Sequence, residues 1–446
     1  MKEEGWFSAW KPYKGNLETT PVAMNEYLPL GQSMVLGAQH AFAMFGATVL
    51  APLLMGFDPS LTMLITGIGT ILFFLITGGR VPSYLGSSFA FIGAVAAVTG
   101  YSGVGSNLNL PVALGGIIAC GVVYAIVGLI VMKSGTVWIE KLLPPIVTGS
   151  IVMIIGLNLA PVTIKGVSSN SFDTWMALVT VLCIGSIAVF TQGMLRRLLL
   201  LVGLILSYVV YFVLANVLGF GKPIHFEPIA NAAWFGLPTL HSPVFSTNAI
   251  LLIAPVAVIL IAENLGHFKA VSAMTGKDIS PYMGRAFFAD GLCTTLSAMV
   301  GGTGMTTYAE NIGVMAATKI YSTIVFVFAG VFAILLGLSP KFGALISTIP
   351  VAILGGASIV VFGLITIAGA RIWMNNKIDF SQNGNMLVAA VTIIMGTGNY
   401  SIHLGGFDLG GIGTATFAAI LLNLLLNREK VKQTQPKLED SQLISK

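Results

Sequence analysis

Residues 306–319 read TTYAENIGVMAATK, and this stretch lies between two long apolar runs. It carries Glu310 and is too short and too polar to cross a bilayer by itself. Its β-branched start predicts an extended segment, and the residues from Glu310 onward predict a half-helix. Discontinuous segments of this kind mark binding sites in membrane proteins built from two related halves. A second such segment is therefore expected in the other half of the chain.

Residues 78–88 supply that second segment. They read GGRVPSYLGSS and align with GGTGMTTYAEN at 301–311, an offset of 223 residues. Independently, GSIVMIIGL at 149–157 matches GASIVVFGL at 356–364 at an offset of 207. Together the matches predict two halves of seven segments each. Because seven is odd, the second half enters the membrane from the opposite side, and an inverted repeat favours alternating access around a site near the midplane.

Composition agrees with a membrane protein. Of the 446 residues, 55% are hydrophobic and only 9% are charged, whereas a soluble domain carries roughly a quarter charged residues. No cleavable signal peptide is expected from the residues at the N-terminus, and three cysteines within apolar runs suggest neither disulfides nor a zinc site. The net charge of +5 is explained by basic residues at the ends of spans, so no nucleic-acid partner is expected.

About fourteen apolar segments are predicted. With both termini cytoplasmic, 19 of the 22 Lys and Arg residues fall on the cytoplasmic side, and Lys165, Lys222 and Lys341 fall outside. This is a strong positive-inside pattern, and it favours both the count and the orientation. A cytoplasmic segment, 1–27, precedes the spans, and a polar tail, 428–446, follows them. The spans are 29–55, 61–78, 82–100, 110–132, 143–162, 174–191, 197–219, 247–268, 282–300, 307–318, 322–339, 343–370, 385–398 and 411–427.

Five acidic or histidine residues lie within these apolar spans. An acidic side chain in the middle of a membrane helix costs roughly 2.5–3.5 kcal/mol on insertion scales, so each needs a reason. Glu263 and His267 are four residues apart and therefore share one helical face. They either bind the substrate or a proton, or form a hydrogen-bonded pair that holds two helices together. Their protonation states stay open. His40 either shapes the site or bonds between helices, and Asp290 is expected to be structural or gating.

Glu310 is expected near the N-terminus of its half-helix, where backbone N–H groups favour negative charge; the alternative is a helix cap packed on a neighbour. In the partner stretch, Ser87 and Ser88 are N-cap candidates for a half-helix that starts near Phe89. Two such ends with two carboxylates suit a flat, uncharged, imide-like ring better than an anion. Two carboxylates without further oxygen ligands nearby are also too few for a typical metal site. The glycines of GIGT, at 67–70, predict close helix packing, and no catalytic constellation or cofactor motif is present.

ENIGVMAATK at 310–319 resembles the signature of the nucleobase-ascorbate transporter family, which includes Asn311, Gly313 and a closing Thr followed by a basic residue. QH at 39–40 resembles the family's first-helix motif. QHAFAMFGATVL and YLGSSFAF are similar to bacterial uracil and pyrimidine permeases. The resemblance runs from about Leu28 to Asn427.

The resemblance implies an all-α polytopic membrane protein of fourteen segments in two inverted sevens, with short antiparallel strands in segments 3 and 10. It also implies a homodimer, in which a core domain moves against a gate domain. The core domain would comprise residues 28–133 and 245–340, and the gate domain residues 142–219 and 343–427.

The same resemblance assigns site residues by motif position. Glu263 and Glu310 would bond the ring of a uracil, backbone at Phe89 and Ala309 would contact its edges, and His267 would join a proton network with Glu263. The residues that would wall or support the site are Phe89, Tyr308, Phe362, His40, Ser88, Asn311 and Gly313.

Three departures from uracil permeases bear on specificity. Ala309 stands where they carry Gly, Phe362 where they carry a Tyr, and Asp290 where an Asn is expected. The predicted function is import of uracil across the cytoplasmic membrane, with thymine as a further substrate. The proton gradient drives this import, and no cofactor is expected. The alternatives are a purine or broad nucleobase permease of the same family and an anion transporter of the same fold.

Overall fold

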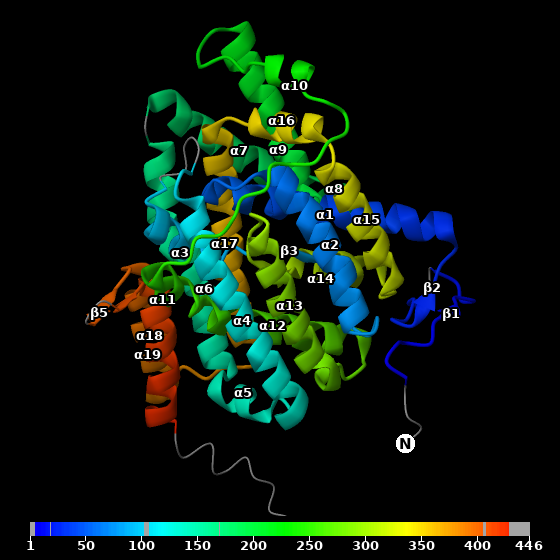
Figure 1. The fold of residues 1–446 in the computed structure, drawn as a ribbon, viewed down its shortest axis with the longest axis vertical. Coiled ribbons are helices and arrows are strands. Elements are labelled where there is room, and N and C mark those ends of the chain that lie inside the picture. The colour runs from blue at the N-terminus through cyan, green and yellow to red at the C-terminus, as the bar shows by residue number, and fades with distance from the viewer. Residues whose placement is uncertain (1–4, 18, 102–106, 169, 405–406, 428–446) are drawn as a thin grey trace, which may run out of the picture.

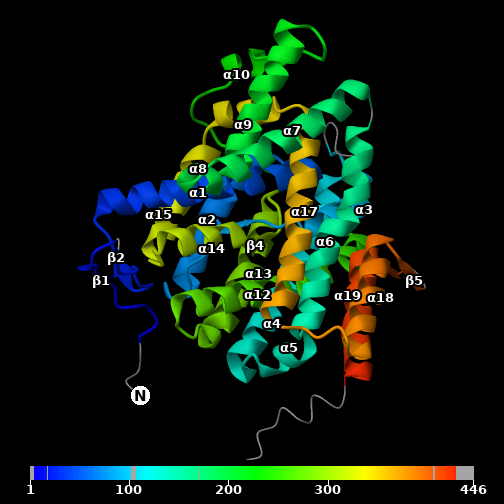
Figure 2. The ribbon, with the colours of Figure 1, turned by 180° about the vertical axis from the view of Figure 1, so that it is seen from behind.

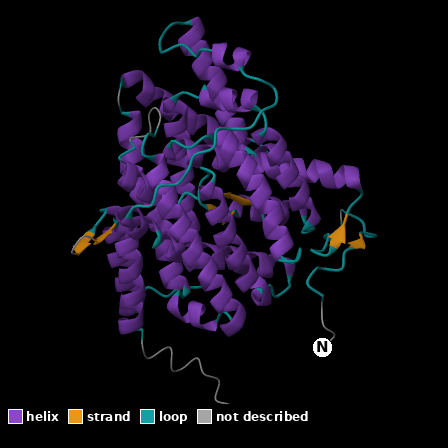
Figure 3. Cartoon of the chain, in the orientation of Figure 1, coloured by secondary structure: helices purple, strands orange, loops and turns teal. Residues whose placement is uncertain are grey.

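The computed structural model describes residues 5–17, 19–101, 107–168, 170–404 and 407–427, which form helices with a few pairs of short strands (Figures 1 and 3). The first half contains β1 (Lys11–Pro12), β2 (Glu26–Tyr27), α1 (Leu30–Met55), α2 (Pro59–Ile76), β3 (Leu85–Ser87), α3 (Phe91–Thr99), α4 (Leu110–Ser134), α5 (Val137–Leu142), α6 (Pro145–Val167), α7 (Ser171–Phe190), α8 (Gly193–Arg197), α9 (Leu199–Phe212), the π-helix η1 (Val213–Val217) and α10 (Glu227–Asn231). The second half contains α11 (Thr247–Ile253), α12 (Val256–Thr275), the 3-10 helix η2 (Ser280–Tyr282), α13 (Met283–Met299), β4 (Met305–Thr307), α14 (Ala309–Thr318), α15 (Ile324–Gly337), α16 (Pro340–Ser347), α17 (Val351–Asn375), α18 (Asn383–Thr397), β5 (Ile402–Leu404), β6 (Phe407–Leu409) and α19 (Gly411–Leu426).

Each predicted apolar segment contains a helix. Among the described residues, eight helices are long and apolar enough to cross a membrane, or nine if a bent pair forms one span. The chain is therefore a multi-pass membrane protein, while the count of fourteen crossings stays a prediction.

The predicted start of the span at 343–370 was wrong. The segment at 343–370 starts inside α16, and the long helix α17 begins only at Val351. Pro350 lacks an N–H and restricts the residue before it, so a continuous helix through this point is disfavoured. Instead, α16 is a separate helix, capped by the Ser339 hydroxyl, which accepts a hydrogen bond from Phe342 N at 3.4 Å. The axes of α15 and α16 differ by 79°.

Helix packing repeats between the two halves. Under the predicted repeat, α2 corresponds to α13 and α4 corresponds to α15, and the structure packs α2 against α15 and α4 against α13. Likewise α7 packs on α17 as α18 packs on α6, and α6 lies directly beside α17 (Figure 2). Contacts between related pairs of elements are expected of an internal two-fold repeat, so the packing agrees with the sequence matches.

Glycines bring these equivalent helix pairs close together. A Cβ on Gly67 of α2 would lie 2.5 Å from the carbonyl oxygen of Gly330 in α15. In the equivalent pair, a Cβ on Gly291 of α13 would lie 2.6 Å from the carbonyl oxygen of Gly121 in α4. Small residues at such contacts let helix backbones approach where lipid supplies no hydrophobic driving force between helices. The predicted packing role of GIGT is thus confirmed at Gly67.

The described part of the N-terminal segment packs against the helices. The ring of Trp10 stacks on Phe74 near the end of α2, and its Nε1 donates to Thr323 Oγ1 at 3.1 Å. The guanidinium of Arg285 in α13 lies 3.9 Å from the centre of the Trp6 ring. The segment therefore connects α2, α13 and the start of α15. The predicted tail, 428–446, lies outside the described residues.

Candidate functional site

The site is built around a pair of short strands that lies within the helices (Figure 3). β3 and β4 pair antiparallel, with Leu85 opposite Thr307 and Ser87 opposite Met305. All residues of both strands are buried. Extended backbone leaves its N–H and C=O groups without partners in its own segment, and hydrogen bonds between the two strands supply those partners away from water. From the ends of these strands the half-helices α3 and α14 begin. The two discontinuous segments predicted from the sequence are therefore brought together directly.

Gly86 allows the two segments to cross closely. A Cβ at this position would collide with the ring of Tyr308. The Tyr308 hydroxyl in turn donates to the backbone oxygen of Ser87 at 2.6 Å. The Tyr308 ring thus lies across the opposite strand and fixes how the two half-helices are placed.

The two half-helices begin differently. α14 starts at Ala309 as expected, with Glu310 in its first turn. α3 starts at Phe91, so the predicted start near Phe89 was wrong by two residues. The cause is local: the Ser88 hydroxyl accepts a hydrogen bond from Ala90 N at 3.2 Å, and Ile92 N donates to Phe89 O at 3.1 Å. Such side-chain bonds hold a turn in place of the first helical residues.

A cavity of about 510 Å³ lies beside this crossing. Carboxylates from two elements line it, because Glu263 projects from α12 and Glu310 from α14. The other predicted site residues on its wall are Phe89, His267, Tyr308 and Ala309. Six predicted residues from three segments of sequence are therefore brought to one cavity.

Glu263 has an unsatisfied oxygen in this cavity. Its Oε2 is buried and has no hydrogen-bond partner among the described residues. Buried polar atoms are nearly always paired, so such an exception is a candidate for ligand contact. His267, one helical turn further along α12, also faces the cavity and makes a 2.9 Å hydrogen bond between its Nδ1 and Thr307 Oγ1.

A buried polar network extends from His267 away from the cavity. Thr307 Oγ1 donates to Asn264 Oδ1, and Asn264 Nδ2 donates to Asp290 Oδ2 at 2.6 Å. Tyr124 OH accepts from the Asn264 amide and donates to the same carboxylate oxygen at 3.3 Å. Since a threonine hydroxyl has one proton, His267 Nδ1 must be the donor in its bond to Thr307. Asp290 therefore lies at the far end of the network, and it is not part of the cavity lining.

Sequence reasoning missed Asn264, Thr307 and Tyr124. Within the long helical spans the predicted polar residues were acidic or histidine, whereas this network joins His267 to Asp290 through neutral groups. A signal was present for Asn264, a polar residue directly after Glu263 in an apolar run.

Five predicted site residues lie outside the cavity lining. Phe362 lines a smaller cavity of about 70 Å³, and its ring meets the Phe89 ring edge-on with centroids 6.0 Å apart. His40 is buried in α1 with its ring 4.7 Å from that of Phe326 in α15, which is an interhelical contact. Ser88 and Asn311 are buried near the strand crossing, and a Cβ on Gly313 would meet nothing within 4 Å.

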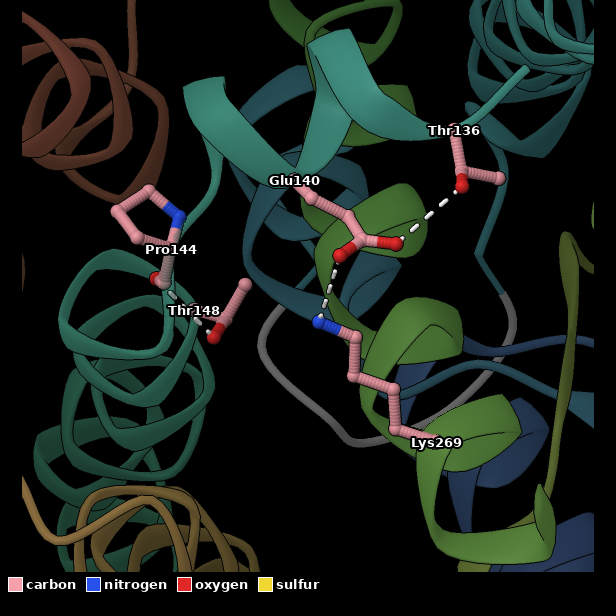
Figure 4. Close-up of polar contacts among 5 residues, drawn as sticks. All are labelled: Thr136, Glu140, Pro144, Thr148 and Lys269. Carbon is pink, nitrogen blue, oxygen red and sulfur yellow. Dashed lines mark hydrogen bonds and ion pairs between the residues drawn. The ribbon is translucent and has the colours of Figure 1, made fainter. Parts of the chain in front are cut away.

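The exposed end of the cavity has a different character from its carboxylate end. Lys269 of α12 and Arg371 of α17 line it, together with Asn375 and Asn376, and all four are exposed. Lys269 Nζ lies 3.4 Å from Glu140 Oε2 of α5 (Figure 4), and the same carboxylate accepts from Thr136 Oγ1 at 3.2 Å. Sequence reasoning assigned no role to these residues, because they lie at the ends of spans, where charge is ordinary.

The described residues contain no group of three or more His, Cys, Asp or Glu side chains arranged to hold a metal ion. The chemistry of the cavity, as far as the described residues show it, combines carboxylates, aromatic rings and backbone groups at helix ends with the exposed cations Lys269 and Arg371.

Comparison with known proteins identifies the family of the chain. A family model described as "Permease family" matches residues 31–404. The chain is 63% identical to the putative pyrimidine permease RutG of Escherichia coli K12, over 97% of this chain and 98% of that one. It is 38% identical to the uracil permease of the same strain, over 94% of this chain and 97% of that one.

Solved structures support the fold alone. The transmembrane domain of the cyanobacterial bicarbonate transporter BicA superimposes with a TM-score of 0.63 at 16% identity, covering 89% of this chain and 97% of that one. The murine anion transporter Slc26a9 in its inward-facing state gives a TM-score of 0.65 at 11% identity, covering 91% of this chain and 69% of that one. The family model and the sequence relatives show that the chain belongs to this permease family, the nucleobase-ascorbate transporters that its motifs predicted.

Proposed function

We propose that the chain is a proton-coupled symporter that imports uracil by alternating access. Its substrate range also includes thymine and related pyrimidine bases. The observation that carries the proposal is the cavity in which Glu263 and Glu310 meet at the crossing of the two half-helices. No cofactor is needed, because the proton gradient supplies the energy. Relatives named as pyrimidine and uracil permeases support this substrate class.

In this proposal the ring of the base lies between Phe89 and Tyr308. Its N–H groups donate to the carboxylates of Glu263 and Glu310, and its carbonyl oxygens accept from backbone N–H groups at the starts of α3 and α14. The unpartnered Oε2 of Glu263 is one acceptor ready for such a donor. A site built to pair with N–H groups rejects analogues that lack them, because its buried polar atoms would be left unpaired.

The coupling proton resides on Glu263 and His267. Both face the cavity, and the bond from His267 to Thr307 ties the ring to the buried network. A proton taken up on this pair with the base, and released when the site changes sides, would couple the two fluxes. The same proposal has the core domain move against the gate domain within a homodimer. The protein lies in the cytoplasmic membrane with both termini on the cytoplasmic side.

The alternatives differ in substrate. A purine or broad nucleobase permease would use the same cavity, and competition of uracil uptake by xanthine separates it from a pyrimidine carrier. An anion transporter of the same fold is disfavoured by two carboxylates on the cavity wall, which would repel an anion when ionised. Chloride or sulfate uptake unaffected by uracil would favour it.

The test is uptake of labelled uracil into proteoliposomes with an imposed pH gradient. Accumulation is expected to follow the gradient and to vanish with a protonophore, and persistence without a gradient would contradict symport. Glu263→Gln and Glu310→Gln are expected to lose uptake while still inserting into the membrane. Glu227→Gln, on the exposed helix α10, is the matched control and should transport normally. Unchanged uptake in either site variant would refute its assigned role.

A further inference from the structure

The cavity is larger than its proposed substrate. A volume of about 510 Å³ is in the range of pockets that hold drug-sized ligands, whereas a single pyrimidine base is far smaller. Thr306 and Tyr308, near the carboxylates, are buried, but Lys269 and Arg371 at the other end are exposed. The space beyond the base is therefore bordered by two cations.

Among the described residues, neither cation has a strong ionic partner. The ion pair between Lys269 and Glu140 spans 3.4 Å, and the two side chains are 45% and 38% exposed (Figure 4). Exposed pairs of this kind contribute little, so a stronger anion can compete with Glu140 for the ammonium group. Arg371 presents an exposed guanidinium, the group best suited to bind phosphate with two parallel hydrogen bonds.

We propose that the cavity binds a pyrimidine nucleoside monophosphate, with its base at the carboxylates and its phosphate between Lys269 and Arg371. The inference rests on the proposed function for the position of the base. Glu263 and Glu310 repel the phosphate and the two cations attract it, so the charges of the cavity fix this orientation.

Such a ligand would act as an inhibitor. Lys269 belongs to α12 and Arg371 to α17, which fall in the predicted core and gate domains respectively. A phosphate bound to both joins the two domains and holds the cavity open toward the side of Lys269 and Arg371. A ligand that binds one conformation better shifts the population toward it and slows the transport cycle. The nucleotide made from an imported base would thereby limit further import.

The experiment is displacement of labelled uracil from the purified full-length protein by uridine 5′-monophosphate, uridine, adenosine 5′-monophosphate and inorganic phosphate. The readout is the ratio of each compound's half-displacing concentration to that of unlabelled uracil. Uridine 5′-monophosphate is expected to have the lowest ratio of the four. Lys269→Gln and Arg371→Gln should each raise that ratio roughly tenfold, the effect of losing one charge-assisted contact.

Two further variants sharpen the test. Glu140→Gln frees the ammonium group of Lys269 and should lower the ratio for the nucleotide about threefold. Lys141→Gln, an exposed lysine of the same helix α5 outside the cavity lining, should leave it unchanged.

The inference is overturned if uridine displaces uracil as well as its monophosphate does, if inorganic phosphate or the adenine nucleotide does so equally well, or if the ratio is the same in the Lys269 and Arg371 variants. A protein that binds no uracil at all would instead overturn the proposed function, and the inference with it.

Discussion

Replacing Thr307 with Val tests the network behind the cavity. The substitution keeps the branched shape of the side chain but removes the hydroxyl that accepts from His267 and donates to Asn264. His267 also faces the cavity, so water can replace its lost partner. Asn264 Oδ1 is fully buried and would keep only the weak bond from Thr306 Oγ1 at 3.4 Å.

One buried acceptor is thus left nearly unsatisfied, which costs about 1–3 kcal/mol of unfolding free energy. The assay is denaturant unfolding of the purified protein, read from the midpoint and slope of the transition. Thr307→Ser restores the hydroxyl and should recover most of the loss. A Thr307→Val protein within about 0.5 kcal/mol of the wild type, the range of ordinary surface substitutions, would refute the network as a source of stability.

Two more perturbations address the strand crossing and the end of the network. Gly86→Ala places a methyl group against the Tyr308 ring and should abolish uracil binding, whereas Gly313→Ala, with nothing within 4 Å of its Cβ, should bind normally in the same equilibrium assay. Asp290→Ala removes the acceptor for the Asn264 amide and should cost about 1–3 kcal/mol in denaturant unfolding, whereas Asp290→Asn keeps an acceptor oxygen and should cost less. Equal stability of the Ala and Asn variants would show that this hydrogen bond does not matter.

Much of the site was predictable because it rests on local chemistry. An ionisable group in an apolar run must have a reason to be there, so Glu263, His267 and Glu310 stood out individually. The spacing of Glu263 and His267 fixed their common helical face before any tertiary contact was known. Repeated glycines and a short polar segment were enough to predict that two discontinuous stretches correspond.

Other features depend on contacts between distant segments. Asn264, Thr307 and Tyr124 are neutral, and their importance appears only when two helices and a strand bring them together beside Asp290 of α13. Phe362 was assigned to the wall of the ring site, but its ring packs edge-on against Phe89 from the side of a different cavity. The start of α3 was displaced by a serine hydroxyl that competes with helix formation, an interaction of a few tenths to about one kcal/mol that a sequence pattern does not resolve.

The sequence by itself therefore determined the class of the protein, its two related halves, its family and the carboxylates of its site. It could do so because the cost of charge in hydrocarbon and the length of a membrane span act on each segment separately. Only the tertiary structure decided which of these residues share a cavity, which neutral groups join them, and that the open end of the cavity is cationic. Those properties arise from close packing of helices far apart in the chain, and no single segment carries them.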